Sequence, residues 1–228
     1  MVIVSSDSAR RRQWGKSERL LSVGNPVFDR SAFPLLRDLP SARKEAESIA
    51  QYYGAHQILC GEKATKIKVR AEMEKSDIIH LALHSVGDSD SALRSKLILA
   101  KDSEGNEAGG TIQAYEIYRL RLASARLVVL SGCTTGIERY LGGEGMMGIS
   151  RSFIARGVPI VVASLWSVDS ESTAELMISF HRHRRVDYVA TAEALRRAQL
   201  ETMSAQSGRY RRPYYWASFV AIGGYTEF

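Results

Sequence analysis

Short, almost continuous apolar runs recur along the second half of the chain, with amphipathic stretches around them. The runs are of strand length and are bounded by polar or glycine residues; they span residues 77–83, 126–131 and 160–165. Strands buried on both faces of a parallel sheet have this pattern. Four other stretches carry apolar residues at helical spacing: 65–74, 146–156, 170–183 and 189–203. The alternation predicts an α/β fold with a mostly parallel central sheet and helices on both faces.

Weaker patterns predict the remaining elements. Shorter strands are expected at residues 1–5, 19–23, 57–60, 96–100 and 216–222, and further helices at 41–50 and 112–119. Ser41 is expected to cap the first of these helices, because it directly follows Leu39-Pro40 and precedes the periodic residues. The turn-forming sequence Gly24-Asn25-Pro26 is expected to end the strand before it.

One domain accounts for the whole chain. Its 228 residues, 45% of them hydrophobic, are enough for one sizeable core. Neither an internal repeat nor a low-complexity segment divides it. We therefore predict a single domain over residues 1–228. Because the chain opens abruptly on an apolar run, residues 1–18 are expected to be an incomplete N-terminal segment of a longer protein.

Composition and charge exclude several classes of protein. No apolar stretch approaches the roughly 20 residues of a membrane helix, and the N-terminus has no signal-peptide pattern. Two cysteines, Cys60 and Cys133, are too few for a disulfide framework, which favours a cytoplasmic setting. The net charge is +6, with basic clusters at 10–12, 182–185 and 209–212. These clusters are scattered and lie in no nucleic-acid motif, so direct nucleic-acid binding is not expected.

Chemically useful side chains follow the three buried strands. His84 follows the run at 77–83, Cys133 follows 126–131, and Trp166 and Asp169 follow 160–165. Parallel strands bring their carboxyl ends to one rim, where α/β proteins bind ligands. An imidazole, a thiol and a carboxylate are therefore expected close together, as a Cys-His nucleophilic site requires.

Spacing and local sequence support Cys133 as a nucleophile. It stands in Gly132-Cys133-Thr134-Thr135-Gly136, where glycine lets the backbone turn sharply and approach a substrate. His84 precedes it by 49 residues, and caspases separate the two by about 50. The alternative is a small buried hydrophobe, the usual role of a free cysteine, and we prefer that interpretation for Cys60.

Two other patterns are assigned to structure. His80 falls in the middle of a predicted strand and is expected to be a hydrogen-bonded interior histidine. No histidine stands at metal-ligand spacing from a cysteine or carboxylate, so no metal site is predicted. The stretch Gly142-Gly143-Glu144-Gly145 lacks the Lys-Ser/Thr of a phosphate loop. We expect it to form a mobile loop beside Cys133.

Five motifs in a fixed order resemble one family. They are Asp77–His84, Leu130–Gly136, Gly143–Gly145, Val162–Asp169 and Tyr214–Phe219. From about Arg19 to Gly224 the chain is similar to the CHAT family of caspase-like peptidase domains. The resemblance implies a caspase-like three-layer sandwich, the fold of the clan that includes caspases, separase and gingipains. It also implies a catalytic dyad of Cys133 and His84.

By the same resemblance the chain is a cysteine endopeptidase, a hydrolase that cleaves a protein or peptide without a cofactor. The backbone N–H groups of Ser85 and Cys133 would bind the oxyanion. Many relatives have Gly after the histidine and Ala before the cysteine, where this chain has Ser85 and Gly132; the change bears on efficiency. Members of the family usually stand beside tetratricopeptide repeats in bacteria, so a repeat region or an activating partner is expected to regulate activity.

The resemblance leaves specificity and activity open. Asp169 and Trp166 are expected to contact the substrate, since acidic residues at similar positions select Arg or Lys at P1 in the wider clan. Equally, Asp169 can be the N-cap of the helix that starts near Ser170. The rival function is a caspase-like interaction or signalling module that cleaves little. A nucleotide-binding flavodoxin-like domain is a more distant alternative.

Overall fold

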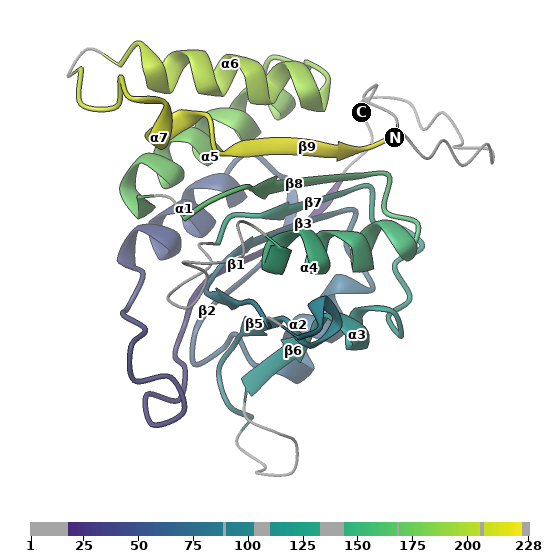
Figure 1. The fold of residues 1–228 in the computed structure, drawn as a ribbon. Helices are drawn as coiled ribbons and strands as arrows, with labels where there is room; N and C mark the ends of the chain where they lie inside the picture. The colour runs from purple at the N-terminus through teal and green to yellow at the C-terminus, as the bar shows by residue number, and fades with distance from the viewer. Residues whose placement is uncertain are drawn as a thin grey trace.

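A six-stranded sheet runs through the middle of the molecule (Figure 1). The structure, a computed structural model, describes residues 18–88, 90–102, 110–132, 144–167, 169–205 and 208–224, with the backbone alone for 144–147. The strands in spatial order are β2 (Ala55–Gly61), β1 (Arg19–Pro26), β3 (Ile78–Ala82), β7 (Leu127–Leu130), β8 (Ile160–Ser164) and β9 (Phe219–Gly223). The first five are parallel and β9 is antiparallel. The predicted mostly parallel α/β fold is confirmed.

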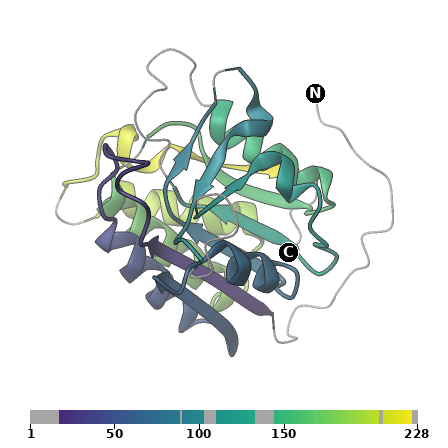
Figure 2. The same cartoon turned by 90° about the horizontal axis from the view of Figure 1, so that it is seen from below.

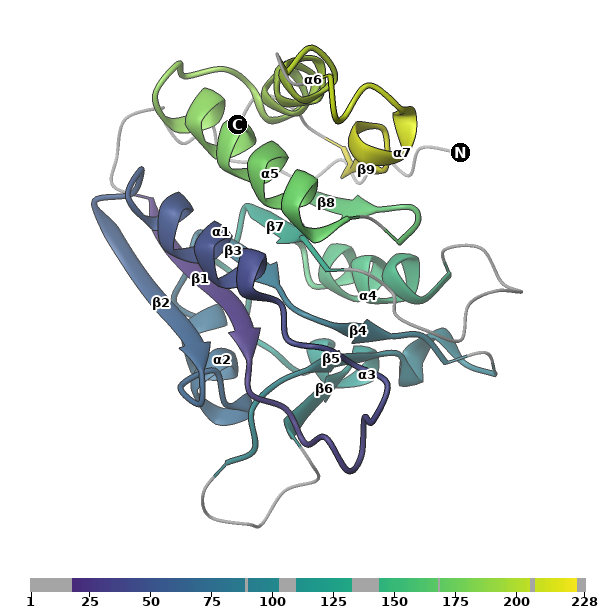
Figure 3. The same cartoon turned by 90° about the vertical axis from the view of Figure 1, so that its left-hand side faces the viewer.

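Helices cover both faces of this sheet (Figures 1 and 3). On one face lie α1 (Pro40–Ala50), α5 (Ser170–Arg185) and α6 (Thr191–Met203); on the other lie α2 (Lys66–Met73), α3 (Ala114–Ile117) and α4 (Glu144–Ala155). A short helix, α7 (Pro213–Trp216), precedes β9. Along β7, alternate residues serve the two cores: Leu127 and Val129 belong to the core under α5, while Val128 and Leu130 belong to the core under α4. Every residue of the strand is therefore buried and apolar.

A second, antiparallel sheet adjoins the main one, and Figure 2 shows it from below. Its strands are β4 (Ser85–Val86), β5 (Lys96–Ile98) and β6 (Thr111–Gln113), with the 3₁₀ helix Ala92–Arg94 between the first two. β4 begins directly after His84. His84 therefore lies at the junction of the two sheets.

The start of the chain differs from the prediction in two places. β1 does not end at Val23; it continues to Pro26 through a β-bulge, where Asn25 adopts a positive φ of 46°. Ser41 does not cap α1. The helix begins at Pro40, with Leu39 as N-cap and no side-chain cap bond. Proline suits the first helical position because its φ is already helical, and Ser41 therefore lies inside the first turn and not at the cap.

Two later predictions were also wrong in part. Residues 112–119 do not form one helix, since Thr111–Gln113 pair with β5 as β6 and only Ala114–Ile117 are helical. The last strand begins at Phe219, and Trp216 belongs to α7. The predicted strand at residues 1–5 lies outside the described residues. In the described ranges, no helix is both long and apolar enough to cross a membrane.

Candidate functional site at the carboxyl ends of β3, β7 and β8

The carboxyl ends of three neighbouring strands form one rim, as their parallel order requires. Leu81 of β3 pairs with Leu130 of β7, and Leu130 pairs with Ala163 of β8. The Ser131 N–H donates to the Leu81 carbonyl oxygen over 2.9 Å, which extends the pairing beyond the end of β7. The residues that follow these strands, among them His84, therefore lie close together at the rim.

Gly132 lies against the residue that precedes His84. A Cβ placed on Gly132 would lie 2.1 Å from the Leu83 carbonyl oxygen, closer than real Cβ atoms approach. The Ser164 Oγ donates to the Gly132 carbonyl oxygen over 3.1 Å and fixes the far side of this contact. Leu83 and Gly132, the residues bonded to His84 and Cys133, therefore touch. Cys133 itself lies outside the described residues, as do Gly142 and Gly143.

The imidazole of His84 is held in one tautomer. Its Nε2 lies 2.7 Å from the carbonyl oxygen of Arg37, and because a carbonyl only accepts, Nε2 carries the proton. Nδ1 is therefore the acceptor nitrogen. It is buried and has no hydrogen-bond partner within the described part of the chain. The ring of Phe28 packs edge-on against the imidazole at 5.5 Å between centroids and limits its rotation.

The electrostatic setting of His84 favours the neutral form. Burial lowers its pKa from the ordinary value of 6.5, and the hydrogen bond to Arg37 and the charge of Asp38 oppose this shift only in part. A neutral imidazole with an unprotonated Nδ1 is the form that can accept a proton from a thiol.

The backbone beyond His84 is fixed by the small sheet. The Ile98 N–H donates to the His84 carbonyl oxygen over 2.9 Å, and Ser85, which is buried, pairs with Leu97. The peptide between His84 and Ser85 is thus held by its pairing with β5. Use of the Ser85 and Cys133 N–H groups for an oxyanion stays a prediction.

Asp169 occupies the structural role that the sequence offered as an equal alternative. It is the N-cap of α5, and its Oδ1 accepts the Ser172 N–H over 2.9 Å. Trp166 is partly exposed, and its Nε1–H donates to the Tyr214 carbonyl oxygen over 3.3 Å, which joins α7 to the end of β8. Both residues follow β8 at the rim, so contact of either with a substrate stays a prediction.

Sequence reasoning missed two residues of the site. Arg37 and Phe28 come from the segment between β1 and α1, which has no regular structure and carried no periodic signal. Arg37 acts through its carbonyl, a group that every residue possesses. Only the fold could therefore reveal it.

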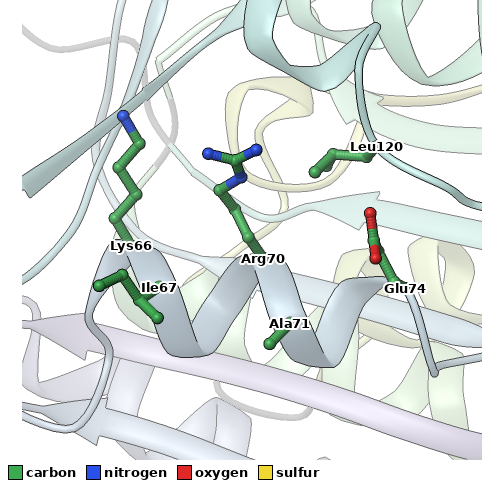
Figure 4. Close-up of a pocket in the computed structure, with 6 residues that line it drawn as sticks. All are labelled: Lys66, Ile67, Arg70, Ala71, Glu74 and Leu120. Carbon is green, nitrogen blue, oxygen red and sulfur yellow. The ribbon is translucent and has the colours of Figure 1, made fainter.

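In the described part of the chain, two hollows differ in how near they lie to His84. A cleft of about 590 Å³ opens beyond the ends of β1 and β2, and Phe28, which also contacts His84, forms part of its wall. A smaller hollow of about 240 Å³ lies on α2, with Leu120 across from it (Figure 4). The charged groups there are already engaged: Lys66 pairs with Glu116 at 2.8 Å, and Glu74 accepts the Arg121 N–H at 2.9 Å. The first hollow is the one that adjoins the site.

Among the described residues, no group of three or more His, Cys, Asp or Glu side chains could hold a metal ion. Cys60 is partly buried on the edge strand β2, and burial raises the pKa of its thiol. A raised pKa keeps a thiol protonated and unreactive. His80 is fully buried, with Nε2 2.8 Å from Glu45 Oε1, which confirms it as a hydrogen-bonded interior histidine.

Comparisons with known proteins agree on the fold. The family model of the CHAT domain matches residues 2–224. Tetratricopeptide repeat protein 28 is 26% identical in Mus musculus and 24% in Homo sapiens; each match covers 88% of this chain and 9% of the relative. The solved Arg-specific cysteine proteinase gingipain R has a TM-score of 0.53 at 10% identity, over 91% of this chain and 46% of that one. A solved protease structure gives 0.57 at 12% identity, over 93% and 48%.

Proposed function

Because the chain belongs to the CHAT domain family, we propose that it is a cysteine endopeptidase with Cys133 as nucleophile and His84 as base. The observation that carries the proposal is the state of His84: Nε2 is committed to the Arg37 carbonyl, and Nδ1 is buried and without a partner in the described ranges. The contact of Gly132 with Leu83 supports it, because it brings the two strand ends together. The fold it shares with gingipain R agrees with the proposal.

Cys133 and His84 together would hydrolyse a peptide bond in two acyl-transfer steps. His84 Nδ1 takes the proton of Cys133 Sγ–H, and the thiolate attacks the scissile carbonyl carbon, whose π electrons move to oxygen. The N–H groups of Cys133 and Ser85 would bind this oxyanion, a donor being worth about 3 kcal/mol. As the C–N bond breaks, His84 returns the proton to the amine. It then takes a proton from water, which attacks the thioester and releases the acid and the thiol.

Covalent labelling tests the proposal. A peptide bearing an electrophilic carbonyl should modify Cys133 and not Cys60, as peptide mass mapping would locate. Labelling should require His84 and be lost in His84→Ala. Because this chain has Ser85 and Gly132 where many relatives have Gly and Ala, slow turnover with intact binding is the second candidate. A protein that binds peptides without labelling at Cys133 would be the interaction or signalling module.

Substrate selection by Asp169 is a separate prediction. If its carboxylate also meets a cationic P1 side chain, Asp169→Asn should lower cleavage after Arg or Lys by about tenfold to hundredfold, the value of a charged hydrogen bond. Asn is as good an N-cap as Asp, so α5 should stay stable. A fluorogenic peptide library measures the effect. Preference for an acidic P1, or an unchanged profile in Asp169→Asn, would remove Asp169 from the substrate pocket.

Regulation from outside the chain is also proposed. The chain spans 9% of the length of its curated relatives, which are named for tetratricopeptide repeats. We expect a repeat region or an activating partner to raise the turnover of these 228 residues well above a low basal rate. Turnover of the chain alone should be compared with that of a full-length protein plus activator. Equal rates would contradict regulation and indicate a constitutive protease. The curated relatives are mammalian, so a bacterial source and a cytoplasmic location stay predictions.

A further inference from the structure

A line of hydrogen-bonded polar side chains is buried between the main sheet and the helices α1 and α5. It runs from Arg184 to Tyr53 (3.5 Å), to His181 (2.7 Å), to His80 (3.2 Å) and to Glu45 (2.8 Å). None of the five is more than 2% exposed. We call these five residues the relay. Figure 3 shows α1 and α5 side by side over the strands that carry His80 and its neighbours.

The donors of the relay all point the same way. A guanidinium only donates, so the Tyr53 oxygen accepts from Arg184, and the Tyr53 O–H is left to donate to His181 Nδ1. His181, which is neutral, then donates from Nε2 to His80 Nδ1, and His80 donates from Nε2 to the Glu45 carboxylate. Starting from the carboxylate, which only accepts, gives the same order of donors and acceptors.

Burial keeps His181 and Tyr53 in their uncharged forms. The pKa of His181 lies well below its ordinary value of 6.5, first because it is buried and then because His80 and Arg184 face it. Burial raises the pKa of Tyr53 to about 12. Arg184 itself is neutralised by a two-pronged pair with Glu18. These side chains also contact Phe180 of α5, Thr191, whose Oγ1 accepts from Arg184 Nε, and Arg185, which lies over the Tyr53 ring.

The relay and the candidate site are built on the same two segments. Glu45 lies on α1 and contacts His80 of β3; Arg37, three residues before α1, contacts His84, two residues after β3. The buried hydrogen bond between Glu45 and His80 thus holds α1 on β3, the same two segments that bring Arg37 to His84. A shift of α1 would move the carbonyl that selects the tautomer of His84.

We propose that Glu45 is a positioning residue: through His80 it holds α1 against β3, and so keeps the Arg37 carbonyl on His84 Nε2. The consequence for peptidase activity rests on the function proposed above. The relay also makes the position acid-sensitive, because a proton added to His181 Nδ1 would face the Tyr53 O–H that donates to that nitrogen. His181 has a depressed pKa when folded, so the stability it contributes is complete above pH 6.5 and is lost as the pH falls below it.

Three variants separate positioning from mere stability. Glu45→Leu removes the acceptor of His80, Glu45→Gln keeps an oxygen acceptor, and Glu47→Leu makes the same change on the exposed side of α1, where Glu47 pairs with Arg43 at 3.0 Å. The first readout is the ¹⁵N spectrum of the five histidines in a Cys133→Ala background, which reports the protonated nitrogen of His84 and needs no catalysis. The second is the rate of Cys133 alkylation at pH 7 in a Cys60→Ala background.

Glu45→Leu should leave His84 as a mixture of tautomers and slow alkylation by about tenfold to hundredfold, as a misplacement of about 1 Å does. Glu45→Gln and Glu47→Leu should match the parent. If Glu45→Leu does not fold, the parent is titrated in acid instead: the His84 signals should change at the pH where His181 is first protonated, with far-UV circular dichroism unchanged. The proposal is overturned if the ¹⁵N signals of His84 are unchanged in Glu45→Leu, or unchanged when His181 is protonated. Because the spectra do not depend on the nucleophile, a failed dyad would leave them interpretable.

Discussion

Replacing Cys133 or His84 by alanine should lower kcat/KM by about 10⁴-fold or more, the usual loss when a nucleophile or its base is removed. In the proposed mechanism, Cys133 Sγ is the atom that forms the covalent bond to the substrate. His84 is the group whose Nδ1 is kept unprotonated by the Nε2–Arg37 bond. The double variant should be no worse than the singles, because the two residues act as one unit. Steady-state cleavage of a fluorogenic peptide measures the loss.

Matched controls separate chemistry from folding. Cys60→Ala removes the other cysteine, and His56→Ala removes an exposed histidine whose Nδ1 contacts only the Tyr53 carbonyl oxygen in the described part of the chain. Both should keep nearly full activity. The Cys133→Ala protein should melt cooperatively near the parent temperature. Substantial peptidase activity in Cys133→Ala would end the proposed mechanism.

The titration of His84 in the Cys133→Ala protein is a linked expectation, since no thiolate can then raise its pKa. The midpoint should fall below 6.5, because burial is the largest influence on it. A lowered pKa in the folded state means that the stability contributed by neutral His84 is present above pH 6.5 and lost as the pH falls. A ¹⁵N-histidine titration checks the midpoint. A value above 6.5 would mean that the imidazole is not the buried neutral base described above.

The sequence was a good guide wherever burial alone determines structure. β3, β7 and β8 are buried at every position, and apart from His80 and Ser164 every residue in them is apolar. The strand-end placement of His84 followed from that. The bulge at Asn25 could not be foreseen, since Gly-Asn-Pro ends most strands, and here it is held inside the sheet by pairing with β2. Tertiary pairing overrode the local turn preference.

The contacts that orient His84 and the relay could not be predicted from the sequence. The Arg37 carbonyl and the Phe28 ring belong to an irregular segment, and the chain is not periodic there. His181 and Tyr53 are separated by 128 positions, and only the packing of α5 on α1 brings them together. Side-chain networks of this kind depend on angles between helices, which a residue pattern does not encode.

Gly132→Ala is expected to lower both stability and reactivity. The new Cβ would stand 2.1 Å from the Leu83 carbonyl oxygen, and backbone cannot rotate away as a long side chain can. Either β7 or the Leu83–His84 peptide must move. Overpacking of this kind costs about 1–3 kcal/mol and sometimes more, and a displacement of about 1 Å at the base costs on the order of 10²-fold in rate. Thermal unfolding and Cys133 alkylation measure the two effects.

Gly54→Ala is the matched control, because a Cβ there has no atom within 4 Å and should leave both measurements unchanged. A second arm uses the family pattern. By the resemblance stated above, many relatives have Gly after the histidine and Ala before the cysteine. Ser85→Gly should therefore free the backbone next to His84 and let the Leu83 carbonyl move aside. We therefore expect Ser85→Gly combined with Gly132→Ala to recover a large part of the stability lost by Gly132→Ala alone. Additive losses in the double variant would show that the two strand ends do not share this space, and wild-type stability in Gly132→Ala would contradict the close contact itself.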